Sequence, residues 1–248
     1  MFNTERHQII LNLLNRSGKV LVKDLAAQFN LTEDSIRKDL ATLESDGLLK
    51  RTYGGAVSLQ ERALMTEANR RRMTQVAAKR AIAAKAFSFI EPKQLVFIDI
   101  SSISIALADL LSNINFNVSV LTNMTDALSI LSRNPHIEIF FAGGSINPAR
   151  DGFTDSLALN FIDQFNPDVA FIAAAAVNFQ LNAAQSHSTS SGSIKAHVIN
   201  RSKKAFLLAE SSKLNRAAHF SFATLDNLTI ISDLRPDNVP AHLHFCSA

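Results

Sequence analysis

Residues 32–57, TEDSIRKDLATLESDGLLKRTYGGAV, decide the fold of the first part of this 248-residue chain. Thr32 has the small hydroxyl group that is favoured at a helix N-cap, and Gly47 marks the end of the helix that follows. Two short strand-like runs, joined by Gly54-Gly55, make up residues 48–57. The helix presents an apolar stripe at helical spacing, formed by Ile36, Leu40 and Leu43. The pattern predicts a helix followed by a β-hairpin wing.

Two further helices are predicted before this segment. The first begins at a cap on Asn3 or Thr4 and ends before Ser17-Gly18. The second covers residues 22–29 and is followed by a turn at Asn30-Leu31. Three helices and a wing are the arrangement of a winged helix-turn-helix, whose third helix enters the major groove of DNA. Residues 1–57 are therefore expected to form a DNA-binding domain.

The outer face of the third helix and the wing carry the residues expected to contact double-stranded DNA. A recognition helix meets base edges near its start, where Arg37 and Lys38 lie away from the apolar stripe. Lys50 and Arg51 lie on the wing, within reach of phosphates or the minor groove. A solvated charged face would explain the helix alone, but not its combination with a basic wing. The predicted contacts are Thr32, Ser35, Arg37, Lys38, Lys50, Arg51, Tyr53 and Gly54.

Charge is distributed unevenly along the chain. Residues 1–80 hold 14 Lys and Arg against 9 Asp and Glu, whereas residues 81–248 hold 11 against 13. A basic first third attached to a slightly acidic remainder indicates that the first third meets a polyanion. Phosphate backbone is the polyanion that agrees with the predicted helix-turn-helix.

The cysteine count and the apolar runs limit the class of protein. Cys246 is the single cysteine, so an intrachain disulfide and a zinc site made of cysteines are excluded. The longest apolar run, residues 169–177, is too short to span a bilayer, and residues 1–6 contain no apolar signal core. We expect a folded cytoplasmic protein without a metal or other cofactor.

From residue 79 onward, strand-like apolar runs alternate with helical segments. This alternation predicts a mostly parallel α/β sheet. The expected strands are residues 95–100, 118–121, 137–141, 169–173, 205–208 and 228–231, with helices such as 104–111 and 157–164 between them. Residues 58–78 are polar and carry Arg70-Arg71-Arg72, so they are expected to be a helical or extended linker to the domain at 79–248.

Ligands of such sheets bind in the crevice beyond the carboxyl ends of the strands. Asp99 and the hydroxyls of Ser101 and Ser102 follow the first expected strand and lead into a helix, whose free N–H groups can cradle a phosphate. Lys213 follows a later strand and carries the ammonium group that suits a phosphate. Further polar or glycine residues at strand ends are Thr122, Asn123, Gly143, Gly144, Glu210, Ser211, Ser212, Ser232 and Asp233. Their common location predicts a small-molecule site.

Several motifs in the predicted DNA-binding domain resemble those of the DeoR-type transcriptional regulators. They are the segments SIRKDL at 35–40, Leu43-Glu44, Gly47 and RTYGGA at 51–56. The resemblance places the helix-turn-helix at about residues 20–39. It implies a transcriptional regulator that represses a carbohydrate-utilisation operon and binds operator DNA as a homodimer or homotetramer. It also implies that the second domain resembles sugar-phosphate isomerases and senses a phosphorylated sugar or related metabolite.

The resemblance extends to the strand ends of the second domain, with departures. This chain keeps the family's Asp99, Thr122-Asn123, Gly143-Gly144, Lys195, Ser212-Lys213 and Asp233. It has Ser101-Ser102-Ile103 in place of Gly-Thr-Thr, Ala173 and Ala176 in place of two glycines, Glu210 in place of aspartate, and no glutamate before Lys195. The expected effector-binding residues are Asp99, Ser101, Ser102, Thr122, Asn123, Gly143, Gly144, Lys195 and Lys213. Either the effector is unusual, or the domain serves only for assembly.

Three alternatives stay open at this point. A sugar-phosphate isomerase fused to a DNA-binding domain would need a base such as Asp99 or Glu210. His242 and His244 lie on one face of a terminal strand and would supply two metal ligands, although no third ligand is visible. The serine-rich residues 186–193 are expected to form either a flexible lid or a surface loop.

Overall fold

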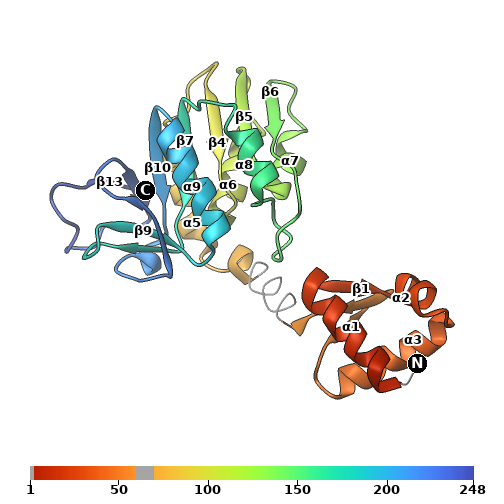
Figure 1. Ribbon diagram of the computed structural model, residues 1–248. Helices are drawn as coiled ribbons and strands as arrows, with labels where there is room; N and C mark the ends of the chain where they lie inside the picture. The colour runs from red at the N-terminus through yellow and green to blue at the C-terminus, as the bar shows by residue number, and fades with distance from the viewer. Residues whose placement is uncertain (1–2, 60–69) are drawn as a thin grey trace. The chain divides into compact units, whose positions relative to one another are not determined.

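The computed structural model of the chain describes residues 3–59 and 70–248, except for the side chains of residues 4, 15 and 16. Its contacts divide it into two compact units, Met1–Arg70 and Arg71–Ala248, here called the front unit and the back unit (Figure 1). Residues 60–69 of the predicted linker lie outside the described residues, so a linker at 58–78 stays a prediction.

The front unit contains the three helices and the wing that were predicted from the sequence. Its helices are α1 (Asn3–Ser17), α2 (Val22–Phe29) and α3 (Glu33–Ser45), and its strands are β1 (Lys19–Leu21), β2 (Lys50–Thr52) and β3 (Gly55–Val57). The predicted stripe of α3 is buried against α1 and α2 in one apolar core. Thr32 caps α3 as expected, because its side chain accepts a hydrogen bond from the backbone N–H of Ser35 at 3.3 Å. The winged helix-turn-helix is therefore confirmed.

Strand β1 was not expected, and it changes the position of one glycine. β1 pairs antiparallel with β3, which pairs with β2. Gly55 consequently lies inside β3, and the turn of the wing consists of Tyr53 and Gly54 rather than Gly54-Gly55. A Cβ on Gly55 would lie 2.0 Å from the carbonyl oxygen of Val20. Glycine is needed at this position because the two strands approach so closely.

The back unit is built on a seven-stranded sheet in which every neighbouring pair is parallel. Its order is β13-β12-β10-β7-β4-β5-β6. The strands are β4 (Leu95–Ile98), β5 (Val118–Thr122), β6 (Ile137–Phe141), β7 (Val169–Ala173), β10 (Lys204–Leu208), β12 (Thr229–Ser232) and β13 (His244–Ser247). All six predicted strands are present, and the parallel α/β fold is confirmed. β13, which carries His244, is an additional strand at the edge.

Helices cover both faces of this sheet. One face packs against α5 (Val76–Phe87), α6 (Ser102–Leu111) and α7 (Thr125–Leu131), which share a core with the sheet. The other face packs against α8 (Ser156–Ile162) and α9 (Thr189–Arg201), which lie in front of the sheet in Figure 1. No described helix is long and apolar enough to cross a bilayer.

The serine-rich residues 186–193 form neither of the two structures that were expected. They end strand β9 and make the first turn of α9, where the Ser188 side chain accepts a hydrogen bond from the N–H of Ser191 at 3.3 Å. This cap explains the composition, since short hydroxyl side chains satisfy the free N–H groups of a helix start. The strand β9 (Ala183–Ser186) belongs to a small antiparallel sheet with β8 (Ala176–Asn178) and β11 (Phe220–Thr224).

The strand order reverses direction at the centre of the large sheet. From β4 the chain proceeds to β5 and β6 on one side, and then returns to β7, β10, β12 and β13 on the other side. β4 and β7 are therefore the switch point at which ligands of open parallel sheets bind. Asp99 directly follows β4, so the fold places this predicted residue at the switch point.

Candidate functional site

The exposed face of α3 carries Arg37 and Lys38, as the sequence predicted. Arg37 is bound to two carboxylates of the same helix, with Nη2 2.6 Å from Glu33 and Nη1 2.6 Å from Asp34. The hydrogen bond to Asp34 is the largest influence that raises the pKa of Arg37 above its usual value. Lys38 has no ion pair among residues 3–59 and 70–248. Of the two cations on this face, only Lys38 could bind a new partner without first breaking an ion pair of the described residues.

The wing is tied to α3 through Glu44. Its carboxylate lies 2.8 Å from Nζ of Lys50 and 2.9 Å from Nε of Arg51, and it accepts the backbone N–H of Arg51 at 3.1 Å. The hydrogen bond from Lys50, followed by those from Arg51, lowers the pKa of Glu44 to about 2. The tip of the wing is open, with Tyr53 fully exposed and Gly54 at a φ of +85°. Glu44 therefore positions both wing cations, a role that the sequence analysis missed.

A second carboxylate of α3, Asp39, connects the helix to α1 from the inside. It is buried and accepts hydrogen bonds from Arg6 at 2.6 and 2.8 Å, and it lies 3.0 Å from Nε2 of His7. Burial alone would raise the pKa of Asp39, but the hydrogen bonds from Arg6 and His7 hold the pKa below its usual value. Asp39 fixes the orientation of α3, and no short-range sequence signal reveals this, because Arg6 lies 33 residues away.

At the carboxyl edge of the large sheet, Asp99 and Lys195 form a buried ion pair. Their side chains are 2% and 6% exposed. Asp99 also accepts the backbone N–H of Ala173 at 2.9 Å, so the pair joins the ends of β4 and β7 to α9. Both residues were predicted to bind the effector, and the fold brings them together from opposite halves of the sheet.

Thr122 and Asn123 lie buried at the end of β5 and differ in whether all their polar side-chain atoms have hydrogen-bond partners. Thr122 donates to the carbonyl of Ile98 at 2.7 Å and accepts the N–H of Met124 at 3.1 Å. Asn123 donates to the carbonyl of Phe153 at 2.7 Å, but its Oδ1 has no hydrogen-bond donor among the described residues. A buried acceptor without a donor is costly. Asn123 therefore keeps one buried acceptor without a donor among the described residues, whereas the hydroxyl of Thr122 is fully engaged by the backbone.

The predicted serines and glycines are placed differently from one another. Ser101 caps α6 by accepting the N–H of Ser104 at 3.0 Å, so its hydroxyl is already engaged. Gly143 is exposed, and a Cβ there would meet nothing within 4 Å. Gly144 has a φ of +151°, and a Cβ there would lie 2.3 Å from Oδ1 of Asp155. Asp155 caps α8 through the N–H of Ala158 at 3.0 Å, so the glycine leaves room for that cap.

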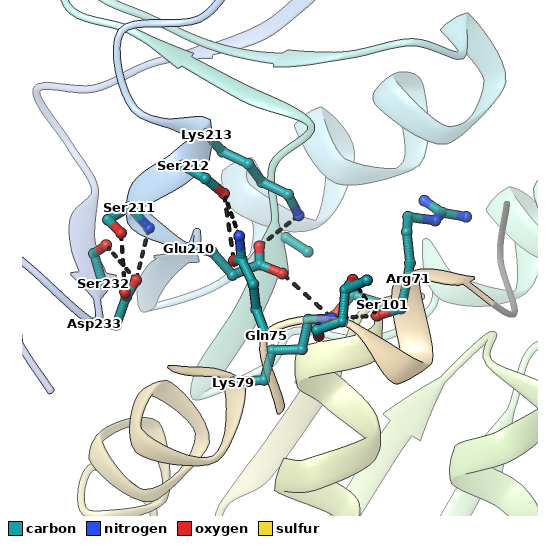
Figure 2. Close-up of polar contacts among 12 residues, drawn as sticks. Arg71, Gln75, Lys79, Ser101, Glu210, Ser211, Ser212, Lys213, Ser232 and Asp233 are labelled. Atoms are coloured by element: carbon teal, nitrogen blue, oxygen red, sulfur yellow. Dashed lines mark hydrogen bonds and ion pairs between the residues drawn. The ribbon is translucent and has the colours of Figure 1, made fainter. Parts of the chain in front are cut away.

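Lys213 belongs to a cluster of charges beyond the end of β10, shown in Figure 2. Its Nζ lies 2.6 Å from Glu210, and Lys79 of α5 approaches the same carboxylate at 3.7 Å. Burial raises the pKa of Glu210, but the charge and hydrogen bond of Lys213 hold the pKa below its usual value. Burial also lowers the pKa of Lys79. The cluster keeps one positive charge in excess, and Lys79 is a member that the sequence analysis missed.

Residues 71–75, in the last part of the predicted linker, are bound by side-chain contacts to the carboxyl edge of the large sheet. Arg72 lies 2.5 Å from Asp126 at the start of α7, and Arg71 lies 3.8 Å from Asp151 in the loop after β6. Gln75 donates to Ser212 beyond β10 at 3.1 Å (Figure 2). Lys79 donates to the carbonyls of Arg71 and Thr74 beneath the segment. Residues 71–75 therefore cross the edge from β5 to β10.

A pocket of about 340 Å³ opens beside this segment, between α5 and α6. Its lining includes the predicted residue Ser102 and the newly found Lys79; the others are Arg72, Val76, Arg80, Ile105, Ala106, Asp109 and Asp126. A pocket of about 420 Å³ lies at the opposite edge, at the amino ends of β5 and β6, and contains none of the predicted residues. Of the two pockets, only the smaller one includes residues from the carboxyl edge of the sheet, Ser102 at the start of α6 and Asp126 at the start of α7.

The histidines at the end of the chain give no metal site in the described residues. His242 lies 3.6 Å from Asp226, and His244 lies on β13. Within residues 3–59 and 70–248, no three His, Cys, Asp or Glu side chains are grouped so as to hold a metal ion.

Comparison with known proteins matches both units to domain families. Residues 6–62 match the model described as the DeoR-like helix-turn-helix domain, and residues 74–234 match the DeoR C terminal sensor domain. The chain is 30% identical over 218 residues to the lactose phosphotransferase system repressor of Lactococcus lactis, covering 87% of this chain and 85% of that protein. It is 29% identical over 236 residues to the L-fucose operon activator of Haemophilus influenzae, covering 94% of each. Ribose 5-phosphate isomerase A from Methanocaldococcus jannaschii matches with a TM-score of 0.41 and 14% identity, over 55% of this chain and 53% of that one.

Proposed function

Because the chain belongs to the DeoR family of transcriptional regulators, with the helix-turn-helix domain before the sensor domain, we propose that α3 and the wing bind operator DNA and that a phosphorylated sugar or related metabolite controls this binding. The effector binds at the carboxyl edge of the parallel sheet in the back unit. The regulator acts in the cytoplasm as a repressor of a carbohydrate-utilisation operon. It acts as a homodimer or homotetramer, because a single DNA-binding domain makes too few contacts with DNA for genomic specificity.

The proposal that the back unit binds an effector is supported by the polar and charged groups near the switch point. Lys79 and Lys213 share a single carboxylate, which leaves positive charge for a phosphate. Asn123 offers a buried acceptor without a donor, which a sugar hydroxyl would satisfy. Neighbouring strands are about 4.8 Å apart, so Asp99 after β4 and Glu210 after β10 span about 10 Å. A small molecule that carries both a phosphate and hydroxyls fits this combination.

We propose binding without turnover at this site. The two carboxylates that an isomerase would use as a base, Asp99 and Glu210, are each paired with a lysine. Such a carboxylate acts as a counter-ion and is a poor proton acceptor. The effector releases DNA only if it binds the DNA-incompetent arrangement more tightly than the competent one.

The DNA-binding half is tested by comparing two single variants. Arg37→Ala is expected to cost about 1–3 kcal/mol of operator binding and to relax base preference at one position. Lys50→Ala is expected to weaken binding to all duplexes about equally and to lower the salt slope by about 1, because it removes a phosphate contact. Both effects are measured by fluorescence anisotropy over a salt series, with an operator selected by the parent protein from a randomised duplex library.

Arg133→Ala is the matched control, since it removes one exposed cation from the back unit. It should leave DNA affinity unchanged. Unchanged binding in both Arg37→Ala and Lys50→Ala would refute the proposed docking of α3 and the wing.

The sensor half is tested by thermal unfolding with a panel of sugar phosphates. A ligand at a hundredfold excess over its Kd should stabilise the parent by about 2.7 kcal/mol, a shift of roughly 5–10 °C for a unit of this size. Lys213→Ala should remove this shift, because the phosphate loses its partner. Lys203→Ala is the control, since Lys203 pairs with Asp168 at 2.7 Å and is 75% exposed. If no phosphate of the panel stabilises the parent, the proposal of a phosphorylated effector is wrong and a vestigial pocket is favoured.

A further inference from the structure

The recognition face of α3 carries two carboxylates on the same turn as its arginine. Glu33 and Asp34 each lie 2.6 Å from a different terminal nitrogen of Arg37. All three side chains are about half exposed or more. The guanidinium that is proposed to face DNA is therefore already bound at both of its terminal nitrogens in the free protein.

These carboxylates cancel the charge of the recognition face. Its ionised residues are Glu33, Asp34, Arg37 and Lys38, whose formal charges sum to zero. Non-specific affinity for DNA comes from cations that neutralise phosphates and release counterions. With no net charge, the first half of α3 contributes little to that general attraction, and residues 1–70 as a whole hold only 10 Lys and Arg against 9 Asp and Glu.

The same arrangement distinguishes two partners that Arg37 would meet on DNA. A phosphate and a guanine edge both present two acceptors to a guanidinium. A phosphate brings a negative charge close to two carboxylates, which raises the energy of the contact. The O6 and N7 edge of guanine is neutral and brings no such repulsion. The flanking carboxylates therefore penalise the phosphate contact more than the base contact.

We infer that Glu33 and Asp34 are specificity-determining residues of DNA recognition, which direct Arg37 away from phosphates and toward a neutral base edge. This inference rests on the proposed docking of α3 in the major groove. The two residues lower affinity for unrelated DNA more than affinity for the operator. They raise the ratio between the two affinities without contacting a base themselves.

The test uses the full-length protein with the substitutions Glu33→Gln and Asp34→Asn, singly and together. We expect the double variant to bind a scrambled duplex about tenfold more tightly, because two repulsions are removed. Its salt slope on that duplex should be steeper by about 0.9, the value for one further phosphate contact. Operator affinity should change by less than about threefold, so the specificity ratio falls. Selection from a randomised duplex library should give a weaker base preference at the Arg37 position.

Asp46→Asn is the matched control, because Asp46 is exposed just after α3 and no ion pair of its side chain is found in the described residues. It changes the net charge by the same amount as either single variant, so equal effects in all three would overturn the inference. An unchanged specificity ratio in the double variant would also overturn it. A larger loss for the operator than for scrambled DNA would show that the carboxylates read bases directly, for instance cytosine N4, and would overturn it too.

Arg37→Ala in the same assay separates this inference from the proposed function. If Arg37→Ala leaves operator binding intact, the proposed docking of α3 is wrong. If Arg37→Ala loses operator binding while Glu33→Gln/Asp34→Asn leaves the ratio unchanged, the docking stands and only the role of the carboxylates is wrong.

Discussion

Replacing Asp39 with alanine is expected to lower the free energy of unfolding of the front unit by about 3 kcal/mol and to abolish operator binding, while the back unit stays folded. The reason is that Arg6, whose side chain is 10% exposed, would be left without its carboxylate. Hydrogen exchange followed by mass spectrometry on the full chain measures this, because it reports residues 3–59 and 71–248 separately. Protection should fall in the first range only.

Asp46→Ala is the control for this experiment, since it removes an exposed carboxylate next to the same helix. Its effect should stay within about 0.5 kcal/mol. Equal protection in Asp39→Ala and the parent would mean that the Arg6–Asp39 pair does not hold α3 in place.

The same pair gives the front unit an acid limit. The pKa of folded Asp39 lies below its usual value of 3.8, so its stabilising contribution is fully present above that value. The contribution is lost as the pH falls below 3.8 and through the lower pKa of the folded state. The parent front unit should therefore lose more stability over this range than the Asp39→Ala variant does.

Replacing Asp99 with asparagine is expected to lower the free energy of unfolding of the back unit by about 3–5 kcal/mol, because it leaves the buried ammonium of Lys195 without a counter-ion. Asparagine still offers an oxygen to the N–H of Ala173, so the loss reports the charge pair. Thermal unfolding with and without the sugar-phosphate panel measures both stability and ligand response.

The double variant Asp99→Asn/Lys195→Met separates structure from sensing. It removes both buried charges, and we expect it to recover most of the stability, since such pairs are often replaceable by apolar groups. It should not recover the ligand-induced shift, because the proposed site has lost two of its groups. A double variant that still responds to ligand would place the effector elsewhere.

Asp168→Asn is the control for a surface pair of the same type. Its partner Lys203 is 75% exposed, and the pair should contribute less than about 1 kcal/mol. If Asp99→Asn costs no more than this control, the buried pair does not stabilise the back unit.

Strong local patterns made much of the fold predictable. The stripe of α3 and the six strands, each of four to six mostly apolar residues, stand out against polar neighbours, and the structure contains all of them. The strands that were missed are short or poor in β-branched residues. β1 has three residues, and β9 reads AAQS, so neither one shows an alternation that can be recognised.

The candidate site was predictable only where residues directly follow strands. Asp99 and Asn123 could be located in this way, because parallel strands end at a common edge. Lys79 and Asp39 could not, since each acts through a partner distant in sequence. Asp39 and Arg6 are 33 positions apart, and Glu210 lies on a different element from Lys79. Such pairs depend on the completed fold, and an isolated charged residue on a helix gives no sign of them.

The switch point between β4 and β7 also sets the order in which the site is completed during synthesis. Asp99 and Asn123 lie before β7 in the chain, whereas Lys195, Glu210 and Lys213 lie after it. A ribosome adds about 5–20 residues per second, so roughly 5–20 seconds separate the translation of Asp99 from that of Lys195. During this interval Asp99 has no counter-ion, and β4 lacks one neighbour until β7 has been made. The nascent chain therefore completes the carboxyl edge of the large sheet late, after the front unit has been synthesised.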